Sequence, residues 1–170
     1  MDIVLRAVAE SDLPVIYRLT SEPEATGEHE WFGWQDPWHY RRRWEADGML
    51  GEDGGVLMVG HEDEVLGFVS WSKRRTARTS FCWNMGIALL PEARGHGYGT
   101  AAQRELVRYL FLHTQVNRIE ASTEIGNLAE QRALEKAGFT REGVMRGAGF
   151  QGGRWHDGAV YSVLRSEVEP

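Results

Sequence analysis

A glycine-rich loop that precedes a helix is the segment of the chain best suited to bind an anion. It reads Arg94-Gly95-His96-Gly97-Tyr98-Gly99-Thr100. Glycines let the backbone approach a phosphate closely, and the free amides and dipole at the start of a helix favour negative charge. Arg94 adds a cation beside these donors. The loop therefore predicts a phosphate site rather than a simple connection, for which one glycine would suffice.

Two well-known nucleotide-binding motifs match this loop poorly. A P-loop nucleotidase requires a lysine before its final Ser or Thr, but Gly99 is followed directly by Thr100. A dinucleotide-binding fold is closer, because Glu120 stands in the next expected strand, near the position of a ribose-binding acid. However, the glycines are spaced G-x-G-x-G, and Pro91 to Arg94 separate them from the preceding strand. These departures argue against both nucleotide folds.

Residues 86–100 resemble the acetyl-coenzyme A loop of the GCN5-related N-acetyltransferases, whose core Q/R-x-x-G-x-G/A is here Arg94 to Gly99. Residues 127–139 are similar to the family's N-x-A/S-x-x-x-L/Y-x-K-x-G-F helix. The subgroup that acetylates ribosomal-protein N-termini is resembled at Leu5-Arg6, Asp12-Leu13, Glu142-Gly143, Asp157 and Tyr161. The likeness spans almost the whole chain and implies a single N-acetyltransferase domain over residues 1–170.

The resemblance implies acetyl-coenzyme A as cosubstrate, with its pyrophosphate on the loop amides. Its pantetheine arm would pair with the preceding strand like an added strand, and one backbone amide would polarise the thioester carbonyl. The Asn127 side chain would contact the same arm, and it is equally suited to cap the helix that follows. The implied cosubstrate residues are Ile87, Ala88, Leu89, Arg94, Gly95, His96, Gly97, Tyr98, Gly99, Thr100 and Asn127.

The implied reaction is direct attack of a primary amine on the thioester in a ternary complex, which needs a group to accept the proton of the amine. The family often carries Glu at the place of Asn84 and Tyr at the place of Leu134. Since this chain has neither residue, we expect Glu124 to act as the base and Tyr161 as the acid. The alternative interpretations are that Glu124 is a solvated loop acid and that Tyr161 is a half-buried strand residue. The two departures also leave open a catalytically silent module that binds or senses coenzyme A.

An aromatic segment follows several glutamates near the N-terminus. Its aromatic residues are Trp31, Phe32, Trp34, Trp38, Tyr40 and Trp44, and the glutamates are Glu22, Glu24, Glu28 and Glu30. The family places the acceptor wall here, and aromatic faces with carboxylates suit a cationic amine. The acceptor would be a small-molecule amine or a protein N-terminus. An apolar plug beneath the first helices, or a homodimer contact, would explain the same residues.

Composition excludes several other classes of protein. The 19 Lys and Arg against 25 Asp and Glu give a net charge of -6, which argues against a nucleic-acid binder. The single Cys82 cannot close an intrachain disulfide, and no apolar run reaches the roughly 18–20 residues of a spanning helix. The N-terminus lacks a signal-peptide pattern, so we expect a cytoplasmic protein without membrane contact. The six histidines have no metal-ligand spacing, so no metal is expected.

The periodicity of apolar residues predicts a mixed α/β fold, a single β-sheet flanked by helices, with a βαβ unit at its centre. The expected strands cover residues 3–8, 56–60, 65–71, 79–90, 118–123, 139–150 and 154–165, and the expected helices cover 13–20, about 37–47, 101–113 and 128–137. Pro23 is expected to end the first helical region, and Gly138 to end the last helix as its C′ residue.

Overall fold

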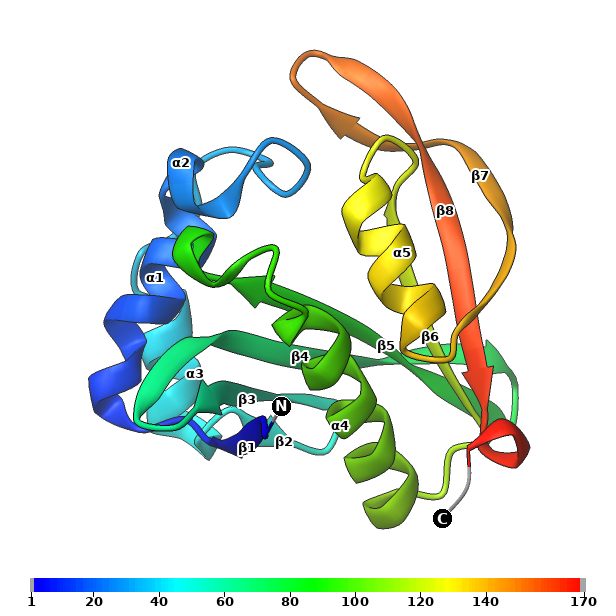
Figure 1. Ribbon diagram of the computed structural model, residues 1–170, viewed down its shortest axis with the longest axis horizontal. Coiled ribbons are helices and arrows are strands. Elements are labelled where there is room, and N and C mark those ends of the chain that lie inside the picture. The colour runs from blue at the N-terminus through cyan, green and yellow to red at the C-terminus, as the bar shows by residue number, and fades with distance from the viewer. Residues whose placement is uncertain (1, 169–170) are drawn as a thin grey trace.

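One eight-stranded mixed sheet with helices on both faces organises the chain in the computed structural model, which describes residues 2–168 (Figure 1). The strand order is β1-β3-β4-β5-β6-β8-β7, and β2 pairs with β3. The elements are β1 (Val4–Ala7), α1 (Leu13–Ser21), α2 (Pro23–Thr26), α3 (His39–Asp47), β2 (Leu50–Gly51), β3 (Gly54–His61), β4 (Glu64–Ala77), β5 (Ser80–Leu89), α4 (Tyr98–His113), β6 (Arg118–Glu124), α5 (Leu128–Lys136), β7 (Thr140–Gln151) and β8 (Arg154–Leu164), with 3-10 turns at Glu10–Asp12, Pro91–Ala93 and Arg165–Glu167.

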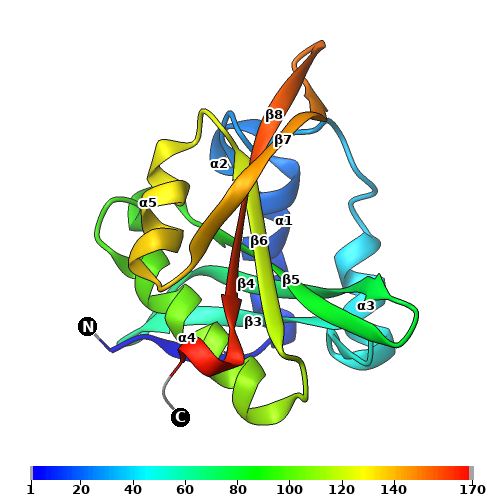
Figure 2. The same cartoon turned by 90° about the vertical axis from the view of Figure 1, so that its right-hand side faces the viewer.

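The helices form two layers that bury the central strands on both sides. Figure 2 shows α4 and α5 on one face of the sheet and α3 on the other, and α1 packs against α3 and β4. Strand β3 reads as a continuous apolar run at residues 56–59 because both of its faces are covered. Ile16 of α1 and Leu106 and Leu110 of α4 are fully buried against the sheet.

The parallel strands β5 and β6 separate soon after they meet. Their pairing covers Trp83 with Ile119, Asn84 with Glu120 and Met85 with Ala121, whereas β5 pairs with β4 as far as Leu89. The two strands diverge in Figure 1, and β6 continues with β8 and β7. Residues 86–89 of β5 therefore have a strand partner on one side, and their other edge faces the opening.

A network of charged side chains ties the β6–β8–β7 part of the sheet together on its outer face. Arg118 bonds both Glu120, at 2.8 Å, and Glu142, at 2.7 Å, and Ser162 donates to Glu142 at 2.7 Å. The contact with Arg118 holds the pKa of Glu142 at about 2. Arg74 extends the network from β4 to Glu120 at 2.5 Å. The network therefore joins strands from both sides of the point at which the sheet opens.

The expected α/β class and order of elements are confirmed, with differences at several ends. The strand expected at 65–71 continues to Ala77, because its exposed, polar second half is held by β5 pairing rather than by burial. Pro23 starts the short helix α2, as proline can occupy a first helical turn. Helix α4 starts at Tyr98 rather than at residue 101, since Gly97 is its left-handed N-cap with φ of 84°. The two-residue β2 was not expected.

Gly67 should be irreplaceable where β4 approaches β5. Its φ is +151°, and a Cβ there would lie 2.1 Å from the backbone oxygen of Ala88. We expect Gly67→Ala to lower the free energy of unfolding by about 2 kcal/mol or more, measured by urea denaturation, since backbone atoms would have to move. The control is Gly143→Ala in β7, where nothing lies within 4 Å. Equal effects of the two substitutions would contradict this account.

Candidate active site

The glycine loop forms the start of α4 as an amide-rich turn. Gly95 and Gly97 have positive φ values of 80° and 84°, which L side chains rarely adopt. The first bond of the helix runs from the amide of Ala101 to Gly97 O at 3.2 Å. Amides that precede this bond have no acceptor within the helix. The loop therefore has backbone amides without a helical acceptor, and their role in anion binding stays a prediction.

Arg94 ties the loop to its surroundings. Its Nε donates to Leu89 O at 3.0 Å, and its Nη2 donates to Ala25 O at the end of α2. Burial lowers the pKa of this guanidinium, although the group remains a cation because arginine titrates far above neutral pH. The side chain thus fixes β5, the loop and α2 relative to one another, and its charge lies beside the amides.

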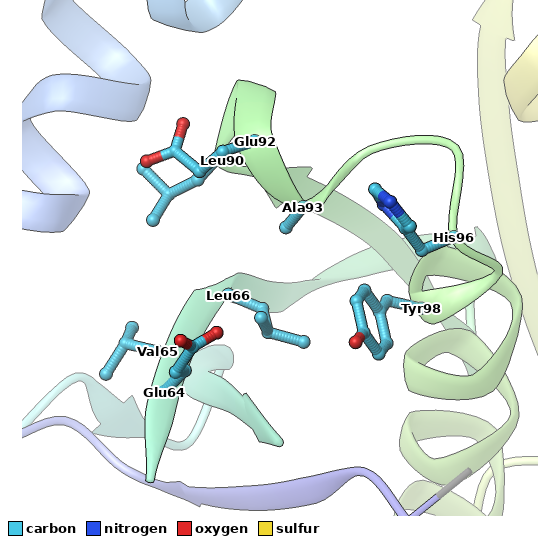
Figure 3. Close-up of a pocket in the computed structure, with 8 residues that line it drawn as sticks. All are labelled: Glu64, Val65, Leu66, Leu90, Glu92, Ala93, His96 and Tyr98. Carbon is cyan, nitrogen blue, oxygen red and sulfur yellow. The ribbon is translucent and has the colours of Figure 1, made fainter. Parts of the chain in front are cut away.

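A cavity of about 540 Å³ lies between the loop and the start of β4 (Figure 3). The rings of His96 and Tyr98 project into it, with their centroids 5.9 Å apart. Glu64 and Glu92 also line it. Arg18 pairs with Glu92 at 2.8 Å, and the negative charge of Glu64 disfavours a phosphate. For these two residues of the loop, the backbone amide rather than the ring is the group available to an anion.

Asn127 caps α5, as one of the two sequence interpretations expected. Its side-chain oxygen accepts from the amide of Glu130 at 3.2 Å. Gln103 of α4 donates to the Glu130 carboxyl at 2.6 Å, which links α4 to α5. Burial raises the pKa of Glu130 to about 7, and the nearby Glu30 carboxylate acts in the same direction. The donor side of Asn127 is the part left for a ligand.

A second cavity, of about 290 Å³, lies at the end of β6. It is lined by the loop that follows α2, by the end of β6 and by the β7–β8 hairpin, namely His29, Glu30, Phe32, Ser122, Thr123, Glu124, Met145, Ala148, Gly149, Gln151, His156, Asp157 and Gly158. Glu124 bonds two imidazoles here: His29 Nδ1 contacts its Oε2, and His156 Nδ1 lies 3.1 Å from its Oε1. These contacts, first with His29 and then with His156, lower the pKa of Glu124.

Tyr161 is placed away from this cavity. Its side chain is fully buried, and its hydroxyl donates to Glu135 of α5 at 3.1 Å. Burial and the bond to Glu135 raise the pKa of this phenol. This geometry favours a structural role for Tyr161 over the predicted role as acid. Leu134, where the family often has Tyr, is buried in the core, and Asn84 pairs with Ser72 and Glu120 in the sheet.

Half of the aromatic residues of this segment are exposed, so the interpretation as an apolar plug is wrong for these three. The exposed fractions of Phe32, Trp34 and Trp38 are 61%, 79% and 61%. Trp44 does pack inward, and its indole N–H donates to Val8 O at 2.9 Å. Phe32 lines the cavity at Glu124. The segment therefore presents aromatic surface beside that cavity.

Sequence similarity decides the family. A model of the acetyltransferase (GNAT) domain matches residues 2–140. The chain belongs to this family. Two relatives from Bacillus subtilis (strain 168) are a probable N-acetyltransferase, YjcK, and a putative ribosomal N-acetyltransferase, YdaF, each 34% identical, over 115 and 85 residues. The matches cover 66% and 50% of this chain, and 62% and 46% of those proteins.

Solved GNAT structures share the fold across nearly the whole chain. The spermidine N-acetyltransferase of Vibrio cholerae, crystallised with CoA and spermine, is 19% identical with a TM-score of 0.83, covering 97% of this chain and 96% of that one. RimL, an acetyltransferase of the ribosomal L7/L12 α-N-protein crystallised with coenzyme A, is 18% identical with a TM-score of 0.80, covering 98% and 96%. At this identity the likeness concerns the fold.

The described residues contain neither a membrane-spanning helix nor a metal-binding cluster. Across residues 2–168, every helix is too short or too polar to cross a bilayer. The same part of the chain contains no group of three or more His, Cys, Asp or Glu side chains able to hold a metal ion. His29 and His156, which the sequence offered no reason to join, are 127 residues apart in the chain and meet only through Glu124.

Stability should depend on pH through Glu130. Its pKa of about 7 lies above the ordinary 4.5, so between these values the unfolded chain loses a proton that the folded one keeps. The stability contributed by this group is therefore complete below about pH 4.5 and falls as pH rises to about 7. We expect Glu130→Gln, which can still accept from Gln103, to be more stable than the parent at pH 8, by roughly 1–3 kcal/mol, and equal to it near pH 4. Urea denaturation at both pH values measures this difference, and a gain independent of pH would contradict it.

Proposed function

We propose that the protein transfers an acetyl group from acetyl-coenzyme A to a primary amine by direct attack in a ternary complex. The observation that carries the proposal is the early end of the β5–β6 pairing. It leaves one edge of residues 86–89 without a strand partner, next to the amide-rich loop and across from the strand that ends at Glu124. Membership of the GNAT family supports the same reaction.

The residues of this region fit acetyl-coenzyme A. An amide cradle with two left-handed glycines suits the pyrophosphate, and an open strand edge suits the amide groups of the pantetheine arm. The loop amides from Gly95 to Thr100, the backbone of Ile87 to Leu89 and the donor side of Asn127 would hold it. Bound there, acetyl-coenzyme A supplies a thioester whose carbonyl carbon accepts a nucleophile.

The amine would enter the cavity at Glu124. Glu30, Glu124 and Asp157 line it, so its negative charge favours an ammonium group. Phe32 adds an aromatic face, which also attracts a cation. Structural neighbours named for spermidine and for ribosomal-protein acetylation support small amines and peptide N-termini as the acceptor candidates to test.

Thiol release from acetyl-coenzyme A across an amine panel tests this proposal. The panel contains polyamines, small monoamines and short peptides with free N-termini, and each peptide has an N-acetylated copy as control. We expect turnover with at least one free amine and none with the blocked copies. Tight coenzyme A binding without turnover on any amine would favour a silent binding module instead.

Coenzyme A binding should depend on the space beside Gly99. This residue has an ordinary helical φ, and its Cβ would meet Leu89 Cδ1 at 3.6 Å, so a side chain is compatible with the fold. We expect Gly99→Leu to weaken coenzyme A binding at least tenfold by filling the room that the pantetheine arm needs. Isothermal titration measures the affinity. Glu105→Leu, at an exposed position of the same helix, is the control, and equal affinities in both variants would place coenzyme A elsewhere.

Phe32 should contribute to amine binding. We expect Phe32→Ala to raise the KM for the amine about fivefold, the value of a cation–π contact near 1 kcal/mol, with an unchanged KM for acetyl-coenzyme A. Trp38→Ala is a matched control, because Trp38 is equally exposed, at 61%, but does not line the cavity. Steady-state kinetics with the amine varied distinguish the two. A similar KM in both variants would remove Phe32 from the acceptor site.

A further inference from the structure

We infer that His29 accepts the proton of the amine, and that Glu124 and His156 position its ring. The inference rests on the proposed function and names the base that this function requires. It assigns a role to a histidine in the loop between α2 and α3, at the end of the sheet that also carries the β7–β8 hairpin (Figure 1). It also changes the role of Glu124 from a base to a positioning residue.

Both ring nitrogens of His156 have a hydrogen-bond partner. Its Nε2 lies 3.1 Å from the backbone oxygen of Gln151, which can only accept, so Nε2 carries a proton. Its Nδ1 lies 3.1 Å from Oε1 of Glu124. If the His156 ring were neutral, its Nδ1 would carry a lone pair, and this lone pair would be repelled by the carboxylate of Glu124. A further proton therefore lies between His156 and Glu124, and both ring nitrogens of His156 are committed.

His29, in contrast, has a hydrogen-bond partner at Nδ1 but none within residues 2–168 at Nε2. Its Nδ1 contacts Oε2 of Glu124, and a carboxylate oxygen accepts, so Nδ1 is the donor. A neutral ring with its proton on Nδ1 has its lone pair on Nε2. The nearest acid to Nε2 is Glu28 Oε1 at 3.6 Å, beyond hydrogen-bonding distance. His29 lines the cavity of the proposed acceptor site, and within residues 2–168 its Nε2 has no hydrogen-bond partner, so we assign this lone pair to the amine.

Glu124 itself is less suited to take the proton. Each of its oxygens already contacts an imidazole, and these contacts lower the pKa of its carboxyl. A weaker base takes a proton less readily from an ammonium group. A carboxylate that holds the Nδ1–H of an imidazole instead fixes the tautomer and stabilises the imidazolium that forms.

The structure holds the His29 ring in place from both sides. Gln151 Nε2 donates to the backbone oxygens of Glu28 and Trp31, at 2.7 and 2.9 Å, and these residues flank His29 in the loop. Gly126 leaves room for the ring, since a Cβ there would lie 3.6 Å from His29 Cε1 and 3.1 Å from Glu124 Oε1. The position of the base therefore depends on the hairpin and on the turn after β6.

Acidic side chains from several elements surround His29. Glu28 and Glu30 flank it in the loop, Glu124 comes from β6 and Asp157 from β8. His156 opposes them with the proton that it shares with Glu124. Glu130 of α5 lies close to Glu30 and adds to the negative side as it ionises near neutral pH.

The proposed step is balanced without a further reagent. The amine enters as an ammonium ion, and one proton passes to His29 Nε2 and then to solvent. The nitrogen lone pair forms the N–C bond to the acetyl carbon, and the C–S bond breaks with its electrons on sulfur. The second proton of the amine ends on the thiolate. The products are the amide, coenzyme A and one released proton.

Kinetics of His29→Ala test the inference. We expect kcat to fall by about 10²–10⁴-fold at pH 7, with unchanged coenzyme A affinity, and the rise of kcat with pH to lose its imidazole-dependent limb. Added imidazole should restore part of kcat, which loss of structure would not allow. Glu124→Gln should move the limb to lower pH, because loss of the carboxylate charge disfavours the imidazolium. His39→Ala, at an exposed position on α3, should behave as the parent. An unaltered pH profile in His29→Ala would overturn the inference.

Nitrogen NMR of the histidine rings gives a readout without turnover. In the unaltered protein at pH 8, His29 should carry its proton on Nδ1, and His156 should keep its proton on Nε2. A proton on Nε2 of His29 would overturn the inference whatever the activity. An unaltered protein that turns over no amine would instead overturn the proposed function, whereas normal turnover by His29→Ala would overturn only the role of His29.

Discussion

The early end of the parallel pairing between β5 and β6 is the constraint on which the site depends. Parallel neighbours require a crossover, so α4 must begin where β5 ends, and the glycine loop is fixed there. Since β6 stops pairing with β5 after Met85, the last residues of β6 hold Glu124 on the far side of the opening. The proposed acetyl-coenzyme A and amine sites are thus separated by a gap in the sheet rather than by a loop.

The ion network on the outer face holds together the strands on the two sides of the opening. A sheet that opens gives up strand pairing, and each unpaired edge loses hydrogen bonds. Arg74 reaches Glu120 across this point, and Arg118 holds Glu120 and Glu142. The strands that diverge at one end are therefore tied at the other. The first half of β4 is also buried, and both α1 and α4 pack against this strand.

The backbone features of this site can be predicted from the sequence, whereas its side-chain contacts largely cannot. The glycine loop and the cap at Asn127 were predictable, because turns and caps depend on neighbouring residues. The contact of Glu124 with His29 and His156 joins three separate segments, and no local spacing reports it. Tyr161 has a residue type suited to catalysis, but strand alternation alone could not show that it faces α5. Exposure of the aromatic segment was equally hidden, since apolar side chains usually predict burial.

Gln151 anchors the loop between α2 and α3, and this anchoring has an evolutionary consequence. Gln151 holds this loop through the backbone oxygens of Glu28 and Trp31, not through their side chains. Any residue offers the same backbone oxygen, so substitutions in the loop would leave its position intact. Related proteins could therefore exchange the side chains at the proposed amine site, one at a time, and acquire new acceptors without rebuilding the fold.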